Sequence, residues 1–219
     1  MSEVIITVRG ENEARVAPER AVAHISVSAD GPQRGAVVEL IAALATPVRE
    51  DLAARKAAGT LTDWSSQRVS VWSDRPWNNE GRQLDLVHHA SVELTATFTD
   101  FMVLSDWLNE VAERDGLQVG AVEWLLSPET RAHVEREVAT AAVAVAVDRA
   151  TAYAGAIGLT SVAPVEIADL GLLTGGAEAG PSPRMFAKAA MDSAGGSAID
   201  FQPDDIVVAA AVEARFRAS

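Results

Sequence analysis

Histidines and carboxylates are the side chains in this sequence with the widest catalytic and metal-binding chemistry. His88 and His89 are adjacent in a predicted strand, where neighbouring side chains point to opposite faces. They therefore cannot easily bind one ion together. His133 and Glu137 stand four residues apart on a predicted helix and can reach each other, but the HExxH pattern of zinc hydrolases is absent. We predict an ordinary surface contact there and no metal site.

Other catalytic signatures are missing from the sequence. It contains no GxSxG, no GxxxxGK[ST] and no GxGxxG motif, and its lack of cysteine removes thiolate nucleophiles and cysteine-ligated metals. The pair Asp204 and Asp205 precedes the last predicted strand, which is typical of a solvated turn, with a general-acid pair as the alternative. We predict no enzyme activity, no catalytic residue and no cofactor.

The best candidate for a binding surface is a predicted hairpin turn rich in tryptophan and arginine. Trp72, Arg75, Trp77 and Arg82 surround this turn. Exposed tryptophan beside arginine is enriched among the residues that anchor protein interfaces. The alternative is that Trp72 packs over the sheet and Trp77 stacks on its own turn. We predict that these four residues belong to the interface of a homo-oligomer.

Charge and hydropathy limit the classes of partner. The 219 residues include 18 Lys and Arg against 31 Asp and Glu, a formal charge of −13, which opposes binding to nucleic-acid phosphates and anionic lipid. No apolar run reaches the roughly 18 residues of a membrane span, and charges interrupt the first twenty residues. We expect an acidic cytoplasmic protein with no nucleic-acid partner and no membrane insertion.

The elements that must position these residues include strands with clear alternation. Residues 4–8 and 206–216 predict the first and last strands, and residues 119–126 and 165–170 two more. Residues 64–72 and 84–98 predict a long antiparallel hairpin around the turn 74–81. Two predicted strands have an apolar face that we expect to be buried. In the first this face is Ala23, Ile25, Val27 and Ala29. In the second, which we expect to face the helices, it is Ala90, Val92, Leu94, Ala96 and Phe98. Their polar faces carry His24, Ser26, Ser28 and Asp30, then Ser91, Glu93, Thr95 and Thr97.

Three amphipathic helices are also predicted. The first runs toward Gly59, the second starts at a Thr99 or Asp100 cap and ends at Gly116, and the third starts at Ser127 and Pro128. Alternation over residues 143–147 also suits a strand, but length and capping favour a helix. The predicted apolar stripes are Val37, Leu40, Ile41, Leu44, Val48 and Leu52; Phe101, Leu104, Leu108 and Val111; and Val134, Val138, Ala141, Val145 and Ala152.

The order and spacing of these segments resemble the SIMPL family, which includes bacterial periplasmic immunogenic proteins and domains of unknown function. The resemblance runs through residues 6–10 with 16–19, 92–98, 100–108, 139–158 and 203–206. It implies an α+β fold with an antiparallel sheet backed by helices, a tendency to self-assemble, and no established catalytic residue. Many bacterial relatives are exported, whereas we expect no signal in this chain, and residues 62–66 depart from the family's usual Ile-x-Thr.

The leading hypothesis is one SIMPL-like domain over residues 1–219, with a mobile, glycine- and proline-rich excursion at residues 171–202. It describes a non-enzymatic homo-oligomer that acts through interaction surfaces, with a stress-related or envelope-related setting. The alternative is a small-molecule-binding protein or enzyme with a pocket between the helices and the sheet.

Overall fold

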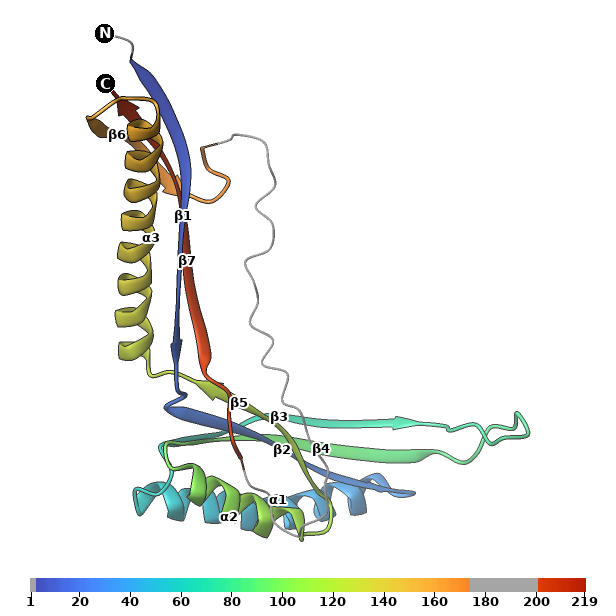
Figure 1. The fold of residues 1–219 in the computed structure, drawn as a ribbon. Coiled ribbons are helices and arrows are strands. Elements are labelled where there is room, and N and C mark those ends of the chain that lie inside the picture. The colour runs from blue at the N-terminus through green and yellow to red at the C-terminus, as the bar shows by residue number, and fades with distance from the viewer. Residues whose placement is uncertain (1–2, 174–200) are drawn as a thin grey trace. The chain divides into compact units, whose positions relative to one another are not determined.

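The computed structural model describes residues 3–173 and 201–219 (Figure 1). The elements are β1 (Val4–Val16), β2 (Arg20–Gly31), α1 (Arg34–Ala57), β3 (Asp63–Asp74), β4 (Val87–Phe98), α2 (Phe101–Ala112), β5 (Leu117–Leu125), α3 (Pro128–Ala156), β6 (Val162–Asp169) and β7 (Ile206–Ala218). Two antiparallel sheets and three helices confirm the α+β prediction. The excursion predicted at residues 171–202 lies mostly outside the described residues.

The chain divides into two compact units. Unit 1 holds β1, α3, β6 and β7, and unit 2 holds β2, α1, β3, β4, α2 and β5. Each unit has its own sheet and its own helical cover. Within the described part of the chain, no helix is long and apolar enough to cross a membrane.

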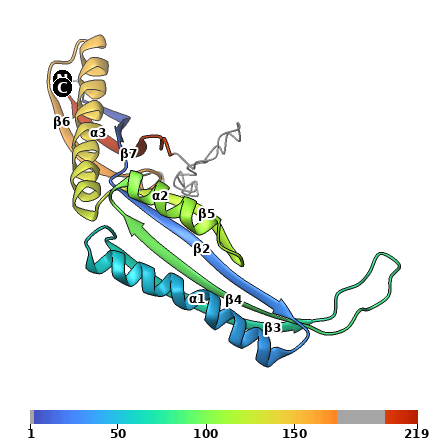
Figure 2. The same ribbon diagram turned by 90° about the horizontal axis from the view of Figure 1, so that it is seen from below.

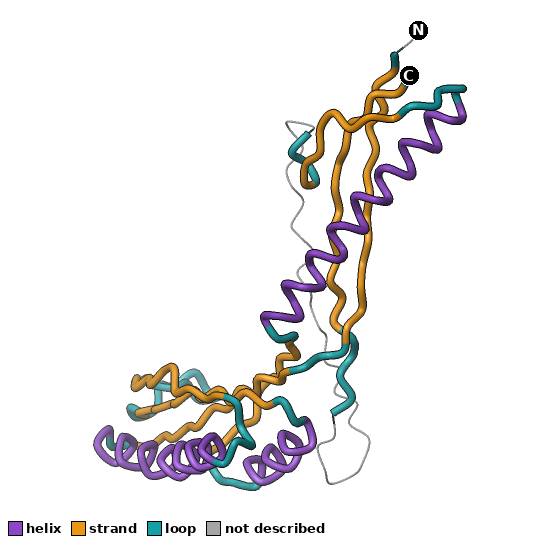
Figure 3. The backbone as a smooth tube through the Cα atoms, turned by 90° about the vertical axis from the view of Figure 1, so that its left-hand side faces the viewer, coloured by secondary structure: helices purple, strands orange, loops and turns teal. Residues whose placement is uncertain are grey.

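Unit 2 is a four-stranded sheet in the order β3-β4-β2-β5, with α1 and α2 against one face (Figures 2 and 3). The predicted apolar face of β4 is buried, from Ala90 to Phe98, and the apolar face of β2 lies beside it in the same core. Because side chains alternate along a strand, the polar residues of β2 and β4 occupy the opposite face, which α1 and α2 leave open. The predicted inward face of β4 is therefore confirmed, whereas the strand begins at Val87 and not at residue 84 as predicted.

The helices of unit 2 begin and pack largely as predicted. The carboxylate of Asp100 caps α2 by accepting from the backbone N–H groups of Met102 and Val103. One part of the α1 stripe was wrong: Leu40 is 45% exposed, and Ala45 is buried instead. The residues of α1 that pack on the sheet are spaced by three or four and form a narrow stripe along the helix. Leu40 lies beside this stripe and stays exposed.

A polar contact joins α1 to α2 beside this core. Nε1 of the fully buried Trp107 donates to Oδ2 of Asp51 at 2.8 Å. Nε of Arg55 donates to both oxygens of Asp51, at 3.0 and 3.1 Å, and Nη2 of Arg55 donates to Glu110 at 2.7 Å. Asp51 therefore satisfies a buried indole N–H and holds an arginine that reaches the second helix.

Unit 1 is a three-stranded sheet in the order β1-β7-β6, with α3 packed along β1 and β7 (Figure 1). Ser127 and Pro128 start α3 as predicted. The predicted α3 stripe is correct at Val134 and Val138 but wrong beyond them. The residues that face the sheet are Ala142, Ala146, Ala150 and Ala154, not Ala141, Val145 and Ala152.

Close helix–sheet contact explains this correction. A Cβ atom added to Gly10 of β1 would lie 2.0 Å from the carbonyl oxygen of Ala142 and 2.8 Å from the backbone nitrogen of Ala146. The helix backbone thus rests directly on the strand. Only small side chains fit along such a contact, so the alanines face inward and the valines lie beside it.

Candidate functional site

The predicted hairpin extends past the rest of its sheet. Strand β2 accompanies β4 only as far as the pair Gly31 and His88, whereas β3 stays paired with β4 out to Asp74 and Val87. Residues 75–86 then form the connecting loop. We call residues 68–86 the hairpin arm; its end projects beyond the other strands of unit 2 (Figure 1).

Local hydrogen bonds order the loop of the hairpin arm. The side-chain oxygen of Asn78 accepts from the backbone N–H groups of Glu80 and Arg82, at 3.0 and 2.8 Å. The backbone N–H of Asn78 donates to the carbonyl of Arg82 at 2.9 Å, and Gly81 adopts a φ of 73°, which favours glycine. These contacts present Trp77 on a defined turn.

The hairpin arm exposes a concentration of large apolar side chains. All four predicted interface residues, Trp72, Arg75, Trp77 and Arg82, are exposed, and the arm brings them together within one hairpin. The sequence prediction missed the apolar residues near them. The alternation of β3 and the two leucines of the loop could have revealed these residues. The exposed apolar residues of the arm are Val69, Trp72, Trp77, Leu84 and Leu86, with exposures of 39 to 68%. Val69 and Trp72 lie on opposite faces of β3, and the other three residues lie in the loop. Large apolar side chains left exposed in one segment, above all tryptophan, are typical of binding surfaces.

The two adjacent histidines lie where β4 meets the loop, and they contact different residues of β3 on opposite faces of the sheet, as their adjacency predicts. Nδ1 of His88 lies 2.6 Å from Oγ of Ser73, and Nε2 of His89 lies 3.0 Å from Oδ1 of Asp74. Trp72 stacks on His89 with ring centroids 5.2 Å apart. A serine–histidine pair can act in nucleophilic catalysis when a carboxylate orients the histidine, but Asp74 contacts the other histidine. These cross-strand pairs tie β3 to β4 and support Trp72 from one side.

The other histidine pair lies on a helix surface, as predicted. Nε2 of His133 and Oε1 of Glu137 are 3.3 Å apart on exposed turns of α3. Among residues 3–173 and 201–219, no group of three or more His, Asp or Glu side chains is placed to hold a metal ion.

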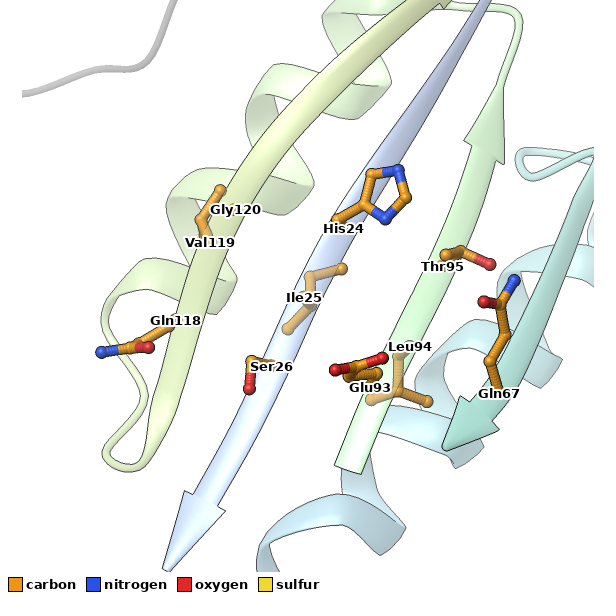
Figure 4. Close-up of a pocket in the computed structure, with 10 residues that line it drawn as sticks. All are labelled: His24, Ile25, Ser26, Gln67, Glu93, Leu94, Thr95, Gln118, Val119 and Gly120. Atoms are coloured by element: carbon orange, nitrogen blue, oxygen red, sulfur yellow. The ribbon is translucent and has the colours of Figure 1, made fainter. Parts of the chain in front are cut away.

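A second feature of unit 2 is a polar depression on its open sheet face. It has a volume of about 600 Å³ and is lined by residues from all four strands (Figure 4). Two β-bulges flank it: Gln67 is the extra residue between Ser66 and Arg68 of β3, and β5 carries an extra residue opposite His24. Bulges bend a strand and increase its twist, which hollows the sheet between them.

His24 and Gly120 shape one side of the depression. A Cβ atom on Gly120 would lie 3.1 Å from the carbonyl oxygen of His24, so glycine permits the close approach of β5 at the bulge. Nε2 of His24 lies 3.4 Å from Oε1 of Glu123, without hydrogen-bond geometry. Figure 4 places Thr95 across from His24, and Glu93 across from Ser26, on the neighbouring strands β4 and β2.

The position of this depression differs from the pocket expected in the alternative hypothesis. We expected a pocket between the helices and the sheet. In the described residues that layer is the apolar core of unit 2, and the depression lies on the opposite face. The polar alternation of β2 and β4 predicted this face, but the bulges that hollow it depend on pairing between strands.

The fold and these surfaces define a class: an α+β protein built from two helix-backed antiparallel sheets, with a projecting hairpin. The model of the SIMPL family, described as proteins of unknown function (DUF541), matches residues 6–216. The chain belongs to this family, which confirms the resemblance seen in its sequence. No curated protein matches the chain.

Proposed function

We propose that this SIMPL-family protein acts by protein–protein contact, through self-association of the hairpin arm, rather than by catalysis. The observation that carries the proposal is the ordered, projecting arm with five exposed large apolar side chains, Trp77 foremost at 68% exposure. A tryptophan on a hydrogen-bonded turn loses less conformational freedom when it binds, because the backbone that carries it is already ordered.

The arm has the chemistry of an interface anchor. A tryptophan buries up to about 250 Å², so covering the exposed part of Trp77 removes roughly 170 Å² from water, an upper limit of about 4 kcal/mol at 25 cal/mol per Å². Arg75 and Arg82 stand exposed beside it. A second copy of a chain with 31 acidic and 18 basic residues offers carboxylates for these guanidinium groups.

Sedimentation of the wild type and of Trp77→Ala across a concentration range tests this proposal. If Trp77 is an anchor, its truncation weakens association by roughly 1 to 4 kcal/mol and leaves the unfolding of the protein nearly unchanged. Tyr153→Ala is the matched control, since Tyr153 is an aromatic residue 56% exposed on α3. A wild type that stays monomeric at all concentrations refutes the proposal. Equal weakening in both variants refutes the role of Trp77.

The polar depression supports a second candidate function, the binding of a small hydrophilic molecule on the open face of unit 2. Its lining of histidine, glutamate, glutamine, serine and threonine offers hydrogen bonds in several directions. A thermal-shift screen of polar metabolites tests it. A ligand at a hundred times its Kd adds about 2.7 kcal/mol, which raises Tm by roughly 5 to 11 °C in a chain of this size. The shift should disappear in His24→Ala; a screen without any shift argues against this function.

A further inference from the structure

Among the residues that the structure describes, the outer edge of β3 is unpaired along the hairpin arm. In the sheet order β3-β4-β2-β5, strand β3 lies at the end, so no described strand pairs with its outer side. Side chains of α1 bind its first half: Nζ of Lys56 donates to Asp63 at 2.6 Å and Nη2 of Arg49 donates to Ser66 at 3.3 Å. Past the bulge at Gln67, residues 68–74 continue as a regular strand.

Such an edge can accept another strand. An edge strand presents a row of unpaired backbone N–H and C=O groups, and proteins usually blunt long edges with charges, proline or bulges. The bulge of β3 interrupts only its first half. The second half carries Val69, which is 61% exposed, and ends at Asp74. Arg75 follows, and then Pro76, which has no backbone N–H to donate to a neighbouring strand.

We propose that residues 68–74 of β3 pair antiparallel with the same residues of a second copy of this chain, so that the unit 2 sheets of two copies join into one. This inference rests on the proposed self-association and adds its geometry. Pairing a strand with itself about a two-fold axis makes every contact occur twice, as in other symmetric dimers.

Side-chain faces restrict the register of this pairing. Opposed residues of an antiparallel pair share a face, and Arg68, Ser70 and Trp72 lie opposite Glu93, Ser91 and His89 of β4, on the open face of the sheet. Asp74 follows Trp72 by two residues and shares that face.

One allowed register matches opposite charges at both ends. With Val71 on the two-fold axis, Arg68 of each copy faces Asp74 of the other, which gives two Arg–Asp pairs across the junction. Trp72 then faces Ser70 of the second copy. Trp72 also lies diagonally across from Arg68 and Trp72 of that copy, at a separation that long side chains span. The half-exposed Trp72 thereby gains cover on the side that His89 leaves open.

A cysteine scan tests this register directly, because the chain has no cysteine of its own. Opposed residues of an antiparallel pair have Cα atoms about 4.5 to 5.5 Å apart, within the range that a disulfide bridges. Val71→Cys should therefore form a covalent dimer under mild oxidation. Val69→Cys is the matched control, because in this register the two Val69 positions are four residues apart along the strand, about 13 Å, and should not cross-link.

Charge reversal provides a second test that introduces no thiol. Arg68→Glu and Asp74→Arg should each weaken association at least tenfold in sedimentation equilibrium, since each places like charges opposite each other twice. The double variant should return to within about threefold of the wild type. Asp74→Arg combined with Arg136→Glu is the control, because it restores the same net charge with an exposed residue of α3 that does not face Asp74 in this register, and it should not recover. Circular dichroism of every variant establishes that its fold is kept.

The outcomes separate the strand pairing from the proposed function. Association that Trp77→Ala weakens, with no cross-link in Val71→Cys and no recovery in the double reversal, leaves self-association standing and refutes the strand pairing. A selective Val71→Cys cross-link with recovery supports the pairing even if Trp77→Ala changes nothing. Equal cross-linking of Val69→Cys and Val71→Cys overturns the register.

Discussion

The replacement of Gly10 by alanine is the sharpest test of the packing in unit 1, because local and tertiary arguments predict opposite signs. Alanine in place of a strand glycine normally reduces the entropy lost on folding, a gain of about 0.5 to 1 kcal/mol. In this structure the new Cβ atom would lie 2.0 Å from the carbonyl oxygen of Ala142, where ordinary contact begins at 3.4 Å. The difference, 3.4 − 2.0 = 1.4 Å, must come from movement of the helix or the strand.

The cost follows from what that movement breaks. The obstacle is backbone, so no rotamer change relieves it, and α3 must lift from β1. The four inward alanines of α3 are almost fully buried and lose contact with the sheet; a gap of 0.5 to 1 Å already forfeits a quarter to a half of the dispersion energy. Overpacking typically costs about 1 to 3 kcal/mol. We place Gly10→Ala near the upper limit, with a net loss of about 2 to 2.5 kcal/mol after the backbone gain.

Thermal and urea unfolding followed by circular dichroism measure this loss. For a chain of this length that unfolds in one transition, we expect Tm to fall by roughly 4 to 10 °C. If the two units unfold separately, the transition of the smaller unit 1 should shift further. Gly155→Ala is the matched control: it lies in α3, its new Cβ atom meets nothing within 4 Å, and it should stabilise by up to about 1 kcal/mol. Gly10→Ala that is as stable as the wild type would refute the close contact between α3 and β1.

Two further predictions concern unit 2. Asp51→Ala should lower the free energy of unfolding by about 1 to 3 kcal/mol, because it leaves the buried Nε1–H of Trp107 unpaired and releases Arg55; Asp51→Asn keeps an acceptor and should lose less, and urea unfolding that ranks the two equally contradicts the account. The pKa of Asp63 lies below its usual 3.8. The hydrogen bond from Lys56 is the largest cause, and the backbone N–H of Trp64 and the charge of Lys56 lower the pKa further by smaller amounts. A lowered folded-state pKa means that this contact stabilises the fold above the unfolded-state pKa and is lost as the pH falls through the folded-state value. Lys56→Gln should therefore raise the pKa of Asp63 in an NMR titration, and an unchanged pKa would show that the pair does not form in solution.

Local patterns in the sequence determined the elements and much of their orientation. The alternation from Ala90 to Phe98 predicts the buried face of β4, because side chains of a strand alternate whatever the strand packs against. Thr99 or Asp100, and Ser127, predict the starts of α2 and α3, since a cap acts on backbone groups within three residues of it; the structure selects Asp100. The tryptophans and arginines of the hairpin turn are likewise visible in sequence as interface-forming residue types.

Tertiary contacts decided which face of α3 is buried and how the candidate surfaces are built. Hydrophobicity ranks Val145 above Ala146, yet Ala146 faces the sheet, because Gly10 brings the strand so close that only a small side chain fits. The depression beside His24 depends on two bulges, and the position of β3 at the end of the described sheet depends on the order of four strands. Periodicity describes one segment at a time, whereas bulges and edges arise from which segments pair with each other. The sequence by itself therefore determined the strands, helices and family of this protein, and only the tertiary structure decided which of their surfaces are left free to bind.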